Sequence, residues 1–95
     1  MVKDFTYTNV GSHTIASVDM LDKDTCVLTF FEEKVGDNFV VSQVEYWLDD
    51  DEWVFETLEY DIDADFVGNS DKDYLTEEEK QICKDIIKEY LSDLK

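Results

Sequence analysis

Hydrophobic and polar residues alternate with a period of two along the middle of the chain. The clearest case runs from Trp53 to Phe66, where only Glu56 interrupts a series of apolar even-numbered positions. Such alternation is typical of a β-strand that has one face on a core and the other in solvent. We therefore predict one long strand over residues 53–66. Its apolar positions are Val54, Leu58, Tyr60, Ile62, Ala64 and Phe66.

Four shorter segments also have strand character. Gly11 and Ser12 separate the first two, which predicts a hairpin. The third has apolar residues on both of its faces, which indicates a strand covered on both sides. A turn is predicted over residues 33–38, before the fourth segment. The four predicted strands are Phe5–Val10, Thr14–Met20, Thr25–Glu32 and Phe39–Leu48.

The register between the two longest strands follows from their hydrophobic pattern. Pairing Trp47 with Trp53 places the apolar even faces of both strands on one side of the sheet. A shift by one residue places Glu59 and Asp61 toward the core, where an unpaired carboxylate is costly. We therefore predict the first register, which leaves both tryptophans and Phe55 on the outer face of the sheet.

Apolar residues near the C-terminus recur every three or four positions, the spacing of an amphipathic helix. Thr76 and Glu79 stand at the positions of a capping box, so we predict a helix over residues 76–94. Its apolar stripe comprises Ile82, Cys83, Ile86, Ile87, Tyr90, Leu91 and Leu94. The expected fold is a single α+β domain over residues 1–95, an antiparallel β-meander of about five strands packed on one C-terminal α-helix.

The charge of the chain is strongly one-sided. Its 25 acidic residues, eight lysines and complete lack of arginine give a formal net charge of -17. A hydrophobic content of 43% nevertheless indicates a folded chain. A negative field repels phosphates, so we expect no direct binding to nucleic acid or to an anionic membrane. The expected partner is a basic protein surface, for example that of a nuclease or another nucleic-acid-binding protein.

The sequence offers few candidates for catalysis or metal binding. Asp61, Asp63 and Asp65 alternate as in a calcium loop, but an EF-hand needs glycine and glutamate where this chain has Phe66 and Lys72. No nucleophile motif or phosphate-binding loop is present. We therefore expect a protein that is not an enzyme and that uses no metal and no cofactor.

The two cysteines and the single histidine have no zinc-ligand spacing. We interpret Cys26 and Cys83 as buried, reduced side chains and His13 as a surface residue. The chain shows no signal-peptide pattern and no apolar segment of membrane-spanning length. We expect a cytoplasmic protein, in a bacterium or in a host cell, that is a monomer or a dimer.

The acidic residues of the predicted outer face suggest a specific geometry. Alternate residues on a strand are about 6.6–6.8 Å apart, so residues 59–65 are expected to form a regular row of negative charge. A nucleic-acid strand also presents a regular row, with one phosphate per about 3.4 Å of axial rise. Aromatic residues often anchor interfaces. The candidate partner-binding residues are Asp49, Asp50, Asp51, Glu52, Glu59, Asp61, Asp63, Asp65, Trp47, Trp53 and Phe55.

In size, charge, aromatic content and domain type, the chain resembles the small acidic inhibitors made by bacteriophages. These include DNA-mimic proteins that block restriction enzymes, uracil-DNA glycosylase or CRISPR nucleases. The resemblance lies in general character and not in a motif, so no functional residue is carried over. It implies an anti-defence inhibitor that occupies a basic groove. Two alternatives remain open: an immunity or antitoxin protein that neutralises a basic toxin, and a small acidic domain whose charge serves only solubility.

Overall fold

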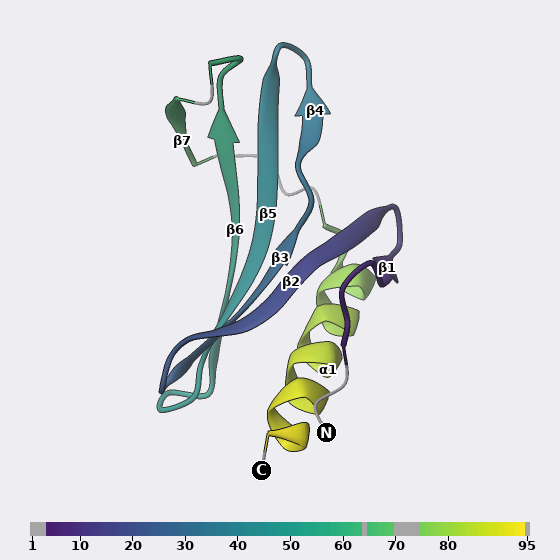
Figure 1. The fold of residues 1–95 in the computed structure, drawn as a ribbon, viewed down its shortest axis with the longest axis vertical. Coiled ribbons are helices and arrows are strands. Elements are labelled where there is room, and N and C mark those ends of the chain that lie inside the picture. Colours follow the sequence, from purple (N-terminus) through teal and green to yellow (C-terminus); the bar gives the residue numbers. More distant parts are fainter. Residues whose placement is uncertain (1–3, 64, 70–74, 95) are drawn as a thin grey trace.

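A computed structural model of the chain describes residues 4–63, 65–69 and 75–94. Within these residues, seven strands form one antiparallel sheet, and a C-terminal helix packs against one of its faces (Figure 1). This arrangement confirms the predicted α+β fold, with two more strands than expected. The strands are β1 (Asn9–Val10), β2 (His13–Asp22), β3 (Thr25–Phe30), β4 (Glu33–Val35), β5 (Asn38–Trp47), β6 (Glu52–Tyr60) and β7 (Phe66–Asn69), and the helix is α1 (Glu77–Asp93).

The sheet order is β1-β2-β3-β5-β6-β7, and β4 pairs with β5 beyond the end of β3. Thr29 of β3 pairs with Gln43, whereas Glu33 of β4 pairs with Val40, so three residues on one side face two on the other. This extra residue is a β-bulge, which bends the strand. The turn predicted over residues 33–38 is therefore wrong, because β4 occupies its first half, β5 begins at its last residue, and only residues 36 and 37 turn.

α1 begins and ends close to the predicted positions. Thr76 is its N-cap, and a capping box joins it to Glu79: the Thr76 hydroxyl accepts from the Glu79 amide at 3.1 Å, and Glu79 Oε1 accepts from the Thr76 amide at 2.8 Å. Ile82 and Leu94 of the predicted apolar stripe are exposed. The buried helix residues are Cys83, Ile86 and Ile87.

The core lies between α1 and the face of the sheet toward it, called here the inner face. Cys26 and Cys83 are both free and buried, as predicted. Burial raises the pKa of the Cys26 thiol to about 11 and that of Cys83 to about 12, so both stay protonated at neutral pH. The buried core comprises Phe5, Val10, Ile15, Cys26, Leu28, Phe30, Val44, Leu75, Cys83, Ile86 and Ile87.

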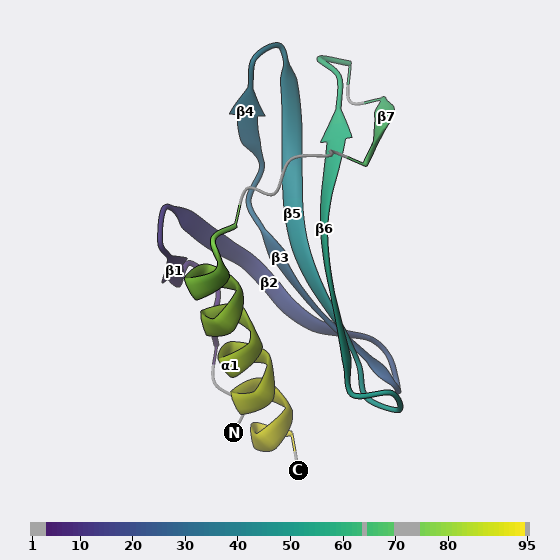
Figure 2. The ribbon, with the colours of Figure 1, turned by 180° about the vertical axis from the view of Figure 1, so that it is seen from behind.

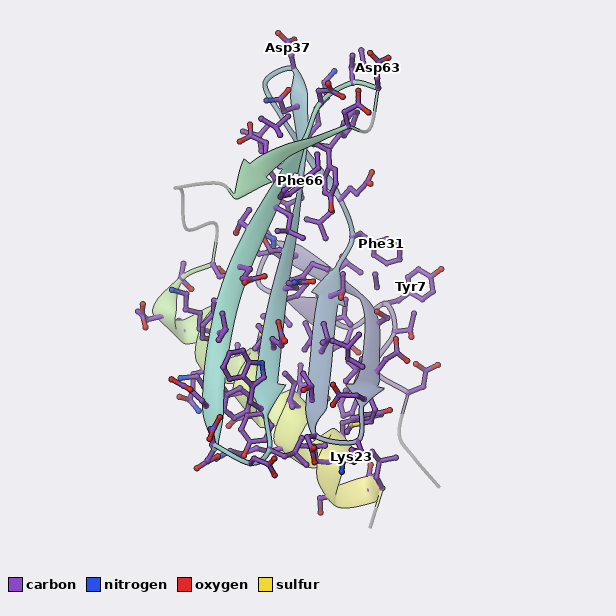
Figure 3. The ribbon with its side chains drawn as sticks, turned by 90° about the vertical axis from the view of Figure 1, so that its left-hand side faces the viewer. Tyr7, Lys23, Phe31, Asp37, Asp63 and Phe66 are labelled. Carbon is purple, nitrogen blue, oxygen red and sulfur yellow. The ribbon has the colours of Figure 1, made fainter. Side chains whose placement is uncertain are left out.

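α1 covers only part of the inner face (Figures 1 and 2). It packs beside the half of the sheet that ends in the β2–β3 and β5–β6 turns, whereas β4, β7 and the adjoining ends of β5 and β6 project beyond its N-terminus. The molecule is accordingly elongated, with extents of 42 × 25 × 24 Å. The opposite side of the sheet, called here the outer face, carries no helix in the described part of the chain (Figure 3).

Candidate functional site

The register predicted for the β5–β6 hairpin is wrong by one residue. Trp47 pairs with Glu52, and Tyr46 pairs with Trp53. Trp53 and Phe55 therefore lie on the inner face and pack against the core, instead of on the outer face. Only Trp47 of the three predicted aromatic anchors lies on the outer face, where its side chain is 37% exposed and its Nε1 donates to Glu45 Oε1 at 2.9 Å.

Interactions with α1 favour the observed register. The rings of Tyr46 and Trp53 stack with centroids 4.1 Å apart. Lys80 Nζ lies 5.2 Å from the Phe55 centroid, and Lys88 Nζ lies 5.8 Å from the Trp53 centroid. Cation–π contacts of this kind contribute about 0.5–1 kcal/mol each at exposed sites. The lysine side of the helix thus covers the β6 aromatics.

The electrostatic cost expected for this register does not arise. Glu59 does lie on the inner face, opposite Val40, but this part of the face projects beyond α1. Its Oε1 accepts a hydrogen bond from Asn38 Nδ2 at 2.7 Å. A partly exposed, hydrogen-bonded carboxylate does not carry the penalty of an unpaired buried one.

The predicted row of carboxylates over residues 59–65 is also wrong. β6 ends at Tyr60, and the following residues form a loop before β7. Asp61 Oδ1 accepts from the amides of Asp63 at 3.0 Å and Asp65 at 2.9 Å, and the Asp61 amide donates to the Asp65 carbonyl at 3.0 Å. This side-chain capping of the backbone is characteristic of aspartate in tight loops. Ala64, assigned to the long strand in the sequence analysis, lies outside the described residues.

His13 is buried, at 4% exposure, so the surface position predicted for it is wrong. Its Nδ1 lies 2.6 Å from Glu33 Oε1, and its Nε2 lies 3.9 Å from Glu79 Oε2. Both glutamates are far from His13 in the sequence, so the local sequence pattern could not predict this cluster. In the described residues, no group of three or more His, Cys, Asp or Glu side chains has an arrangement that could hold a metal ion.

Two turns meet at one end of the sheet and bring six carboxylates together (Figure 1). The Leu48 amide of the β5–β6 turn donates to the Asp24 carbonyl of the β2–β3 turn at 2.8 Å. Burial, together with the charges of Asp49 and Asp22, raises the pKa of Asp24. This group, called here the acidic end, comprises Asp22, Asp24, Asp49, Asp50, Asp51 and Glu52.

Sequence analysis found the β5–β6 half of the acidic end but missed Asp22 and Asp24, because only the sheet register places them there. Asp51 has a positive φ of 50° and accepts a hydrogen bond from the Tyr46 hydroxyl, which fixes the turn. Lys23 is the basic residue within the two turns. The acidic end is therefore a strongly negative surface built on ordered backbone.

The outer face changes character along its length. Near the acidic end, one cross-strand row alternates acids with valines and the next is polar throughout, where Gln43 Nε2 donates to Glu56 Oε2 at 3.1 Å. Toward β7 the pairs become apolar, with Val41 opposite Leu58. Two cross-strand rows contain the polar part: Asp19, Val27, Glu45 and Val54, and then Ser17, Thr29, Gln43 and Glu56.

The described lysines are distributed unevenly between the two sides of the molecule. Lys80, Lys84 and Lys88 lie on α1, behind the inner face, where they contact the β6 aromatics. Of the other described lysines, Lys23 lies in a turn at the acidic end, and Lys34 of β4 lies opposite Phe39 of β5, in the half of the sheet away from the acidic end. The polar half of the outer face thus has carboxylates with little compensating positive charge.

No protein-family model, curated protein or solved structure matches this chain. In the described parts of the chain, no helix has the length and apolar character needed to cross a membrane. Function must therefore be inferred from the geometry and charge of the molecule itself.

Proposed function

We propose that this protein is a non-enzymatic inhibitor that binds the basic, nucleic-acid-binding groove of a nucleic-acid-processing protein, such as a host defence nuclease. The observation that carries this proposal is the acidic end, where two turns that are hydrogen-bonded to each other bring six carboxylates together. The polar half of the outer face continues this surface with Asp19, Glu45 and Glu56, whereas three lysines are interspersed among the six acidic residues of α1. Such a surface is complementary to a basic groove and steers association with it.

The proposed contact surface differs from the one expected from sequence. It keeps Trp47 and the β5–β6 turn and adds Asp22, Asp24 and Glu45. It leaves out Trp53 and Phe55, which pack against the core, and the predicted residues of the row over 59–65: Glu59 on the inner face and Asp61, Asp63 and Asp65 in the loop after β6. Trp47 lies where the acidic end meets the outer face, and its hydrogen bond to Glu45 orients the indole ring. An oriented aromatic ring beside charged groups is a typical interface anchor.

The negative part of the outer face is compact. On β6 its acidic residues are Glu52 and Glu56, which are about 13 Å apart at 3.3 Å per residue, and the strand becomes apolar on this face at Leu58 and Tyr60. The mimicry proposed here therefore rests on a compact cluster of carboxylates, and not on a regular row.

Charge reversal at the acidic end tests the proposal. In a triple variant, Asp49→Lys, Asp50→Lys and Glu52→Lys change three exposed residues and spare Asp51, which binds Tyr46. The matched control changes three exposed acids of α1: Asp85→Lys, Glu89→Lys and Asp93→Lys. Both variants lose the same amount of negative charge, so only the position of the change differs.

Each immobilised protein is used to capture proteins from a lysate of its source cells, at low and then high salt, and the eluates are identified by mass spectrometry. The wild type and the α1 variant are expected to retain one basic nucleic-acid-processing protein that salt releases, and the acidic-end variant is expected to lose it. Equal capture by all three proteins contradicts the proposal. Recovery of a small basic toxin instead supports an immunity protein, and only scattered abundant basic proteins indicate that the charge serves solubility.

A further inference from the structure

The outer face contains an apolar hollow at the end opposite the acidic end. Its volume is about 280 Å³. Phe39, Val41 and Tyr60 line it from the paired strands β5 and β6, and Ile62, which is 79% exposed, follows in the next loop. Two carboxylates, Glu32 from the β3–β4 bulge and Asp61 from the loop after β6, complete its lining.

Neighbouring elements hold the walls of the hollow in place. Phe39 and Tyr60 face each other as a cross-strand pair. The ring of Phe66 in β7 lies 5.7 Å from that of Tyr60, and β7 crosses in front of the sheet on this side (Figure 3). The Asp61 side chain is held in place by the hydrogen bonds that its Oδ1 accepts from the backbone amides of Asp63 and Asp65. The hollow is therefore a formed feature of the fold.

We propose that this hollow receives an arginine side chain from the basic partner. The inference deepens the proposed function and rests on it. Two aromatic rings suit the flat face of a guanidinium group, and two carboxylates supply its counter-charge. A lysine ammonium is a compact point charge that does not use the ring faces as well. The same carboxylates repel phosphate and carboxylate ligands, and the volume is just below the roughly 300 Å³ at which small-molecule sites begin.

The position of the hollow gives it a role distinct from that of the acidic end. The two sites lie toward opposite ends of the outer face, in a molecule whose longest extent is 42 Å. The acidic end provides long-range attraction with little directional preference, because its charges are exposed. A single arginine bound in the apolar hollow fixes how the partner lies along the sheet.

Short peptides test this inference without the partner. Acetyl-Gly-Arg-Gly-amide is titrated into the ¹⁵N-labelled full chain and followed by amide chemical shifts, with the citrulline peptide as a neutral control of the same shape. The expected result is saturable shifts centred on residues 39, 41 and 60 for the arginine peptide and weaker binding of the citrulline peptide. Glu32→Gln and Tyr60→Leu should weaken binding about threefold to tenfold, and Glu78→Gln on α1 should leave it unchanged.

Several results would overturn the inference: shifts centred on the acidic end, equal binding of both peptides, or full affinity in the Glu32→Gln variant. Glu32 is exposed, so this variant remains informative even where Tyr60→Leu perturbs folding. The two proposals fail separately. If acidic-end reversal abolishes capture of the partner but Glu32→Gln binds the purified partner with unchanged affinity, the inference about the hollow is wrong and the inhibitor function stands. Absence of any salt-sensitive partner removes the function whatever the peptides do.

Discussion

Glu79 joins the start of α1 to the β1–β2 turn. Its carboxylate accepts a hydrogen bond from the Thr76 backbone amide and another from the Ser12 backbone, and it lies beside His13. Gly11 in the same turn has φ +63°, and a Cβ atom added there would lie 1.9 Å from Glu79 Oε2. Glycine is therefore favoured at this position by its backbone conformation, and any side chain there would displace the Glu79 carboxylate.

Substituting this glycine should destabilise the fold more than substituting a glycine in open space. A Cβ atom added at Gly36 meets no atom within 4 Å. Gly36→Ala should therefore lower the free energy of unfolding by about 1–2 kcal/mol, through the positive φ of this residue alone. Gly11→Ala should cost about 1 kcal/mol more, because the Glu79 carboxylate must move away from its hydrogen-bond partners. Urea unfolding measures both values, and the Glu79→Ala background should remove much of the difference. Equal costs for the two glycine variants contradict the described packing.

Glu79 also gives the protein a defined acid sensitivity. The Thr76 backbone amide is the main cause that lowers the pKa of Glu79, assisted by the Thr76 side chain, His13 and Ser12, against an opposing effect of burial. Because the folded pKa lies below the unfolded value of about 4.5, this stabilisation is present above pH 4.5 and is lost as the pH falls through the folded pKa.

Glu79→Gln should lower the free energy of unfolding at pH 7 by about 1 kcal/mol, the contribution typical of a hydrogen bond to the fold. The difference from wild type should shrink as the pH falls below 4.5, because wild-type Glu79 then becomes neutral as well. Chemical unfolding at pH 7, 5 and 3 measures this trend, with Glu78→Gln in the same helical turn as the control. A difference that is constant across this range argues against the proposed charge interactions.

Local patterns predicted the helix and the approximate position of most strands, but not every strand boundary or the register of β5 and β6. Of the strand predicted over residues 5–10 only Asn9–Val10 is a strand, and the strand predicted over residues 53–66 ends at Tyr60. The capping box at Thr76 and the turn at Gly11 depend on neighbouring residues, and the structure confirms them. The apolar stripe of α1 is confirmed in part, because Ile82 and Leu94 are exposed.

The β5–β6 register depends on how far the helix reaches along the sheet. The predicted register follows only if the helix buries the end of β6 that carries Glu59, whereas α1 does not reach that end of the sheet. Lys84 and Lys88 of α1 lie instead over the ring of Trp53, nearer the acidic end.

The two tryptophans of this hairpin provide a direct test of the register. Trp53→Ala should cost about 3 kcal/mol, because Trp53 stacks on Tyr46 and packs against the core. Trp47→Ala should cost about 1 kcal/mol or less, because Trp47 lies on the uncovered outer face. Thermal and urea unfolding of the two variants give these values. Similar losses for both would favour the register in which the tryptophans face each other.

For the molecule as a whole, the sequence predicted the sign of the charge but not its location. Twelve acidic residues between Val35 and Asp71 pointed to a basic partner, and the turn at Asp49–Glu52 is part of the proposed surface. The joining of Asp22 and Asp24 to that turn, and the burial of His13, depend on contacts between distant segments. Such contacts follow from topology and cannot be inferred from local spacing.

The most direct test of the proposed inhibitor function is displacement by nucleic acid. The protein is immobilised, allowed to capture its partner at low salt, and washed with increasing concentrations of a duplex DNA or RNA whose length exceeds the 42 Å molecule. If the outer face and acidic end occupy a nucleic-acid-binding groove, the nucleic acid should release the partner at a constant salt concentration, while an uncharged polymer should not. A partner that stays bound in excess nucleic acid, or that binds both ligands at once, contradicts this account.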